Sequence, residues 1–194
     1  MNKQVAMGIL LLALGPLGVV ANAQGMQAKP DQKPTFAMVL DRSMGGLENE
    51  VVSAAEAMPD DKFNFAPTQG EFKGVRTFAQ QVKHIAAVNY MLGAAILMEK
   101  PPMDLGGENG PDKYTSKADC VQFLKDSFAY ARKAFKTIDE SNVLGQVQSP
   151  FGPNKVSRLG LSVIAISHPN DHYGQMVEYL RMNNIVPPAS RPQK

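Results

Sequence analysis

Cysteine is nearly absent from this sequence. Cys120 is the only cysteine among 194 residues, so no disulfide can form within the chain. A single thiolate also cannot assemble a zinc finger or an iron–sulfur site, and both kinds of site are excluded. The fold must therefore depend on its apolar core, and we expect Cys120 to be a small buried side chain within it.

An excess of charge of one sign is also missing. Lysine and arginine together number 20, against 18 aspartates and glutamates, which gives a formal net charge of +2. The basic residues are scattered among the acidic ones rather than gathered in a stripe. Nucleic-acid-binding domains commonly carry a basic patch or stripe, so we expect no nucleic-acid partner.

The apolar run at residues 5–20 is short for a membrane-spanning helix, and Gly15-Pro16 interrupts it. A basic start precedes this run, and Ala21-Asn22-Ala23 follows it in the small-x-small pattern of a cleavage site. Residues 1–23 are therefore predicted to be a signal peptide cut after Ala23, which leaves no stable membrane anchor. The expected location is the periplasm or the outside of the cell, with an uncleaved N-terminal anchor as the alternative.

Beyond that leader, residues 24–34 are polar and contain two prolines, which predicts a disordered N-terminal tail. Residues 35–188 are of the size of one domain. Strand-like alternation and internal repeats are missing from this domain, and apolar residues instead recur at steps of three and four. The pattern predicts four helices: 36–58, 78–98 with Thr77 as N-cap, 116–138 starting at a capping box, and 157–186. We expect an all-α four-helix bundle.

Histidine is also scarce, and its placement is the main functional signal. The chain has three histidines, and His168 and His172 stand four residues apart on the predicted last helix. Residues at that spacing share a helix face, and His84 lies on an apolar row of the predicted second helix. Bundles place metal sites between facing helices. Three imidazoles with an open coordination position can bind a divalent ion, with Zn²⁺ as first choice and Ni²⁺, Fe²⁺ or Mn²⁺ as alternatives.

Two considerations weigh against the metal site. A lone histidine on an apolar face is usually a core residue with one hydrogen bond, and this applies to His84 taken alone. Pro169 also lies between the histidine pair and removes one helix hydrogen bond, to the carbonyl of Ala165. We expect the last helix either to bend there or to restart with Pro169 in its first turn.

Three segments together resemble the DinB-like (damage-inducible protein) superfamily, four-helix-bundle proteins regarded as metalloenzymes. The resemblance covers about residues 36–190, nearly all of the chain after the leader. In that family a histidine on the second helix and an H-x-x-x-H pair on the fourth bind a divalent metal, which implies His84, His168 and His172 here. The segments are P-D-D-K-F-N-F-A-P-T (59–68), F-A-Q-Q-V-K-H-I-A-A-V-N-Y (78–90) and H-P-N-D-H-Y-G-Q-M-V-E-Y-L-R-M-N-N-I-V-P-P-A-S (168–190).

Two functions remain open. One is a metal-dependent hydrolase or transferase acting on an unknown small substrate, in which the metal activates water or a substrate group. The other is a non-catalytic bundle that binds a metal or a small ligand, or assembles with itself as a homodimer. Asn89, Tyr173 and Gln175 are candidate polar groups around the site, each with an ordinary hydrogen-bonding role as the simpler alternative. Asp171 and Glu178 are expected to be solvated, so no general base is assigned.

Overall fold

The computed structural model describes residues 33–192. The predicted signal peptide, residues 1–23, and most of the predicted tail lie outside the described residues. Four long helices form the molecule: α1 (Phe36–Ala57), α2 (Phe78–Leu97), α3 (Lys117–Phe135) and α4 (Arg158–Met182). Between and after them lie three 3₁₀ turns, η1 (Asp60–Lys62), η2 (Gly107–Asn109) and η3 (Pro188–Ser190), and two short strands, β1 (Gln146–Gln148) and β2 (Lys155–Ser157).

Hydroxyl side chains start all four long helices. Thr35, Thr77, Ser116 and Ser157 are the N-caps, and each side-chain oxygen accepts a hydrogen bond from a backbone N–H of the first turn. Such caps satisfy amides that have no partner within the helix. The predicted starts at Thr77, Ser116 and Ser157 are therefore confirmed, and the capping box of α2 is completed by Gln80.

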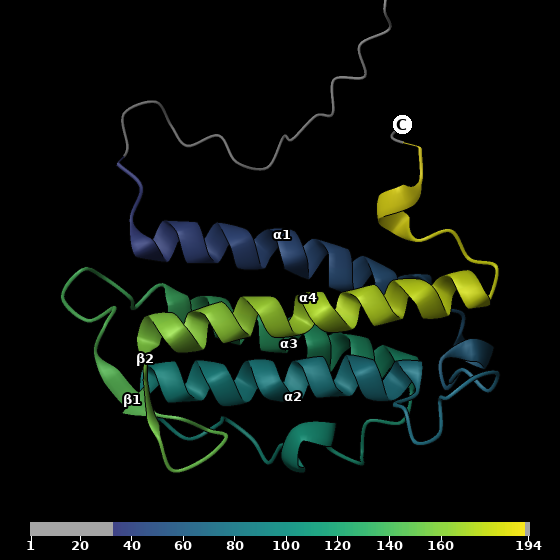
Figure 1. Ribbon diagram of the computed structural model, residues 1–194, viewed down its shortest axis with the longest axis horizontal. Helices are drawn as coiled ribbons and strands as arrows, with labels where there is room; N and C mark the ends of the chain where they lie inside the picture. The colour runs from purple at the N-terminus through teal and green to yellow at the C-terminus, as the bar shows by residue number, and fades with distance from the viewer. Residues whose placement is uncertain (1–32, 193–194) are drawn as a thin grey trace, which may run out of the picture.

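The helices form a bundle in which each contacts two neighbours closely. α2 packs most extensively on α3 and also contacts α4, while α1 packs on α3 and α4. Figure 1 shows α4 lying along the bundle between α1 and α2, with α3 behind them. Most residues of the predicted apolar rows of the second and third helices are buried, including Phe78, Ile85, Leu124 and Phe135, while Met98 at the end of α2 is 69% exposed. The expected all-α four-helix bundle is confirmed, and its packing makes α2 and α4 neighbours.

The structure differs from the predicted fold in the segment 139–156 and on one face of α4. The segment 139–156, predicted as loop, includes β1 and leads into β2 at Lys155, and the two strands pair antiparallel with Val147 opposite Val156. Strands of three residues are too short for their alternation to stand out in the sequence. On α4, the large apolar side chains of Ile164 and Met182 are 38% and 49% exposed, so the apolar residues of this predicted helix do not share one buried face. The buried face of α4 is turned away from them and contains Leu161, Ala165, His172, Met176 and Leu180.

Pro169 does not divide the last helix. α4 runs without interruption from Arg158 to Met182 with the proline inside it, and the proline is buried. Of the two alternatives expected at Pro169, a bend or a restart of the helix, the restart is therefore wrong. Since proline removes one hydrogen bond and crowds a carbonyl in the preceding turn, the tertiary packing of α4 must offset that cost. None of the helices within residues 33–192 combines the length and apolarity needed to span a membrane.

Candidate metal centre

The three histidines meet at the contact between α2 and α4. One ligand nitrogen from each of His84, His168 and His172 lies within 4.8 Å of the other two. The Nε2 atoms of His84 and His168 are 3.0 Å apart, and the three ring centroids are separated by 4.6–4.9 Å. His84 and His172 are buried and His168 is half-buried. The structure thus brings together all three residues that the sequence singled out.

A backbone carbonyl fixes the orientation of His84. Its Nδ1 lies 2.6 Å from the carbonyl oxygen of Glu108, which belongs to η2. A neutral imidazole in that position donates from Nδ1 and keeps the lone pair of Nε2 free. The loop around η2 packs tightly against α2. A Cβ added to Gly110 would lie only 2.9 Å from the Cβ of Lys83. Gly110 also has a φ of +77°, a left-handed conformation that favours glycine.

Two glutamines connect His172 to a carboxylate. His172 Nδ1 lies 2.5 Å from Gln81 Oε1, and Gln81 Nε2 donates to Gln175 Oε1 at 2.8 Å. Gln175 Nε2 in turn donates to Asp171 Oδ2 at 3.1 Å. We call these three side chains, Gln81, Gln175 and Asp171, the glutamine relay. Each donor points away from the histidine, so the relay favours the tautomer of His172 whose Nε2 lone pair is free.

His168 differs from the other two histidines. Its Nε2 contacts His84, while its Nδ1 is buried and has no hydrogen-bond partner among the described residues. An unpaired buried polar atom costs about 1–3 kcal/mol. His168 is therefore placed by packing and by the Nε2 contact with His84, without a partner within residues 33–192 that orients its Nδ1.

The environment keeps all three imidazoles neutral. Burial lowers the pKa of His168 to about 3 and that of His172 to about 4, and it also lowers the pKa of His84. The positive charge of Arg76 adds to this effect at each ring, although the hydrogen bond from His84 to the Glu108 carbonyl acts in the opposite direction. Neutral imidazole is the form that binds metals, so no proton must leave the cluster near pH 7 before an ion enters.

Comparison with known proteins places this arrangement in a family. The family model described as the DinB superfamily matches residues 46–176. The chain belongs to the DinB superfamily. The fold agrees with a crystal structure of a DinB-like protein from Bacillus cereus ATCC 10987, which is 15% identical and superposes with a TM-score of 0.63. That match covers 79% of this chain and 96% of the other. No curated protein matches the chain.

The donor set of this DinB-superfamily chain suits a divalent metal ion. Nitrogens that share one tetrahedral ion with bonds of 2.0–2.1 Å lie about 3.4 Å apart. The pair of His84 and His168 is already close to that separation at 3.0 Å, and the nitrogen of His172 is at most 4.8 Å from each. The Nδ1 atoms of His84 and His172 are occupied by carbonyl oxygens, which is the usual outer arrangement of metal-binding histidines. The residues therefore fit the ion.

The polar residues expected around the site have different roles. Gln175 belongs to the glutamine relay, whereas Asn89 is fully buried and donates to Ser127 on α3 at 3.2 Å. Tyr173 is half-buried against the core. The expected solvation of Asp171 and Glu178 is confirmed by their exposure, and within residues 33–192 no carboxylate joins the histidine cluster.

Three contributors were missed in the sequence: Gln81, Arg76 and the carbonyl of Glu108. Gln81 precedes His84 by three residues, and that helical spacing was available in the sequence as a signal. The Glu108 carbonyl lies in a glycine-rich loop, whose path across α2 no local pattern reveals. Cys120 is buried as expected, and burial raises the pKa of its thiol.

Proposed function

We propose that this DinB-superfamily protein binds one divalent metal ion through His84, His168 and His172 and acts on a small substrate as a metal-dependent hydrolase or transferase. The observation that carries the proposal is the convergence of three neutral imidazoles within 4.8 Å. Three protein ligands leave a position for water or substrate, as in catalytic zinc sites. Zn²⁺ is our first choice, and Ni²⁺, Fe²⁺ and Mn²⁺ are alternatives because imidazole suits several first-row ions.

The chain's own residues would prepare the site in three ways. The Glu108 carbonyl and Gln81 hold His84 and His172 with their Nε2 lone pairs free. Burial of the rings between α2 and α4 limits water around the ligands and strengthens electrostatic interactions there. When bound, the ion would supply a Lewis acid that activates a water molecule or a substrate group.

Metal titration tests the proposal directly, because these three residues are the only histidines of the chain. Untagged protein is titrated with Zn²⁺, Ni²⁺, Fe²⁺ and Mn²⁺ in a calorimeter, beside variants in which each histidine is replaced by Gln. We expect one ion per chain and a loss in each variant larger than the roughly 10–100-fold that an outer-shell change causes. The matched control is Gln122→Met, on the exposed face of α3. Binding that survives in the histidine variants would contradict the proposal.

The second candidate is a non-catalytic bundle that binds a metal or small ligand. It is favoured by one observation, the lack of a carboxylate beside the three histidines within residues 33–192. Co²⁺-substituted protein separates the two candidates, since its absorption spectrum reports the coordination number. An exchangeable water, together with turnover of an ester, amide or thiol-transfer substrate that the histidine variants lack, supports the enzyme. A closed coordination sphere without turnover supports the binding protein.

A further inference from the structure

A polar cavity adjoins the histidine cluster. It has a volume of about 620 Å³, and its lining includes Arg76, Lys83, Asp112, Gln81 and Gln175. The two glutamines belong to the relay that ends on His172. Gln81 and Gln175 therefore line the cavity on one side and connect by hydrogen bonds to the proposed metal ligand His172. Its volume is in the range of about 300–1,000 Å³ that small-molecule sites occupy.

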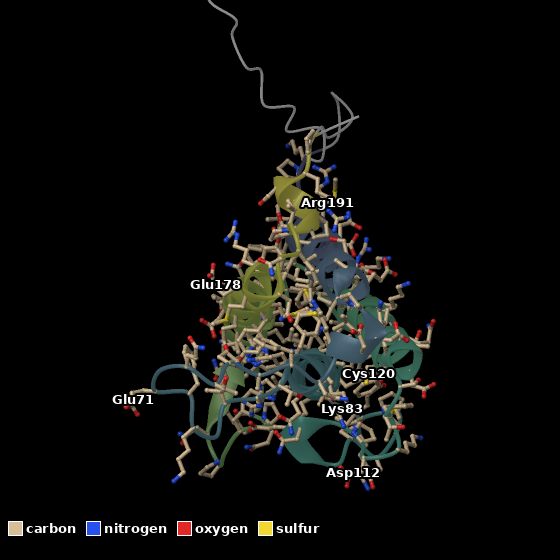
Figure 2. The ribbon with its side chains drawn as sticks, turned by 90° about the vertical axis from the view of Figure 1, so that its right-hand side faces the viewer. Glu71, Lys83, Asp112, Cys120, Glu178 and Arg191 are labelled. Carbon is tan, nitrogen blue, oxygen red and sulfur yellow. The ribbon has the colours of Figure 1, made fainter. Side chains whose placement is uncertain are left out.

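The side chains that line this cavity carry a net positive charge. Two cations, Arg76 and Lys83, face it with one carboxylate, Asp112. Figure 2 shows Lys83 on α2 and Asp112 on the loop beneath it, on the same side of the molecule. Neither Arg76 nor Lys83 belongs to an ion pair within the described residues.

Both cations retain donors that the protein does not use. Arg76 Nη2 has a long contact of 3.4 Å to Asn109 Oδ1, and Arg76 Nε is buried without a hydrogen-bond partner among the described residues. A guanidinium has five N–H donors and an ammonium has three. Lys83 donates at 3.4 Å to the carbonyl of Pro111. A buried, unpaired guanidinium N–H is costly, so its retention beside a cavity points to a ligand.

The free donors come from these side chains and not from the start of α2. Phe78 N and Ala79 N each donate to a carbonyl of the preceding loop at 2.8 Å, and Gln80 N donates to Thr77 Oγ1. The first amides of the helix are therefore occupied. An anion in the cavity would have to be bound by Arg76 and Lys83.

A divalent ion bound to the histidine cluster would also favour a negatively charged ligand. Three neutral ligands would leave the full charge of a divalent ion uncompensated, and such a centre favours anionic ligands. The cavity and the cluster would then attract the same kind of molecule from two sides.

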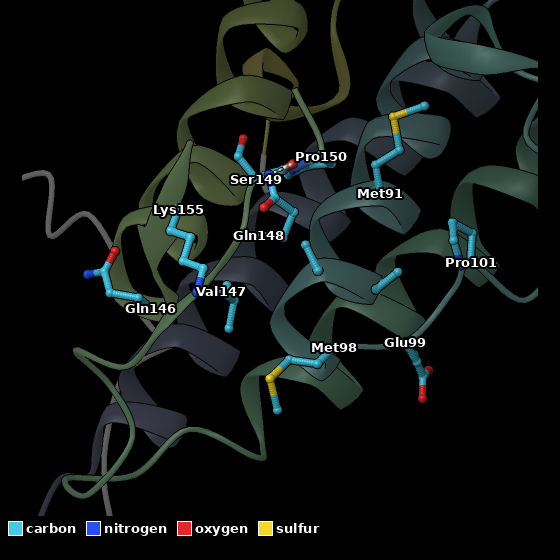
Figure 3. A pocket seen from close by; sticks show the side chains of 12 residues that line it. Met91, Met98, Glu99, Pro101, Gln146, Val147, Gln148, Ser149, Pro150 and Lys155 are labelled. Carbon is cyan, nitrogen blue, oxygen red and sulfur yellow. Dashed lines mark hydrogen bonds between the residues drawn. The ribbon is translucent and has the colours of Figure 1, made fainter. Parts of the chain in front are cut away.

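A second hollow of about 510 Å³ lacks these properties. It lies between the β1–β2 hairpin and the C-terminal half of α2, and Met91, Met98 and Val147 are among its lining residues (Figure 3). Its two charged lining residues, Glu99 and Lys155, have opposite signs. It shares no lining residue with the polar cavity, and its lining includes no hydrogen-bond partner of a histidine, whereas the polar cavity includes Gln81, the partner of His172.

We infer that the substrate is a small anion whose carboxylate or phosphate group binds between Arg76 and Lys83 while the rest of the molecule faces the histidines. The planar guanidinium matches the two oxygens of either group, and Lys83 adds a point charge. The position of the anionic group rests on the cavity alone. Its description as part of a substrate rests on the proposed function.

Anion titration of wild-type and variant proteins tests this inference. The probes are malonate and inorganic phosphate, added separately to Co²⁺-loaded protein, where binding changes the absorption spectrum, and to metal-free protein, where it raises the melting temperature. We expect Arg76→Gln to weaken the better anion at least about tenfold, the loss typical of one charged hydrogen bond. Arg76→Lys should recover part of it. The matched control is Lys73→Gln, which removes one charge from the same loop at an exposed residue outside the cavity.

The outcomes separate this inference from the proposed function. If the protein binds no metal, the proposed function fails, and the melting temperature of the metal-free protein still tests the anion site. If neither anion binds, or if Arg76→Gln weakens binding no more than Lys73→Gln, the inference is overturned. A preference for malonate or for phosphate supports the site and assigns the anionic group. Metal affinity should not fall in Arg76→Gln, because the variant removes a positive charge near the ligands.

Discussion

Replacement of Gln81 by Met tests whether the glutamine relay supports the metal ligands. Gln81 is 2% exposed, and it accepts from His172 and donates to Gln175. Methionine has a similar volume and is tolerated in buried positions, so the change removes both hydrogen bonds while packing is largely retained. The buried Nδ1–H of His172 then loses its acceptor.

The size of the effect follows from these contacts. A buried donor without a partner costs about 1–3 kcal/mol, and the half-exposed Gln175 can replace its lost bond with water. We therefore expect the metal-free Gln81→Met protein to lose about 1–3 kcal/mol of unfolding free energy. Loss of an outer-shell partner lowers metal affinity about 10–100-fold, or about 1.4–2.7 kcal/mol.

Calorimetric metal titration and urea denaturation measure the two effects separately. Gln81→Glu retains an acceptor for His172 but cannot donate to Gln175, so it should keep most of the metal affinity that Gln81→Met loses. Gln122→Met, which removes an exposed glutamine bonded to Asp126 on α3, is the matched control. The reasoning is refuted if Gln81→Met binds metal as tightly as the wild type.

Two further predictions concern the histidines and the proline between them. Because the pKa values of His168 and His172 are lowered to about 3 and about 4, the unfolded chain binds protons that the folded chain does not as the pH falls below 6.5. The unfolding free energy of the metal-free protein should therefore decrease by roughly 1–2 kcal/mol per pH unit between pH 6 and 5, as measured by urea denaturation. A variant with Gln at both positions should lose most of this dependence and keep only the part that comes from His84, whose pKa is also lowered. Pro169→Ala should raise the unfolding free energy by about 1–2 kcal/mol, because a restored hydrogen bond outweighs the greater entropy of the unfolded chain. A thermal scan measures this gain, and a fall in the metal affinity of Pro169→Ala would show instead that the proline sets the geometry of the site.

Local patterns in the sequence were enough to predict the four helices and the shared face of His168 and His172. Thr77 and Ser116 mark helix starts because a hydroxyl that caps the first turn acts on residues two or three positions away. The apolar rows predict the buried faces of the second and third helices because a helix repeats every 3.6 residues. The shared face of His168 and His172 follows from the same repeat, and α4 preserves it through Pro169.

The rest of the site depends on contacts between segments far apart in the chain. His84 meets the pair on α4 only because α2 packs beside α4, and this choice of neighbours is made by the burial of whole helix faces. The Glu108 carbonyl reaches His84 through a loop whose path depends on Gly110 against α2. Gln81 and His172 are 91 residues apart, and neither local segment contains a pattern that predicts their hydrogen bond. Periodicity thus determined which side chains share a helix face. Only the tertiary structure decided which faces meet, because that depends on packing and hydrogen bonds between segments that are far apart in the sequence.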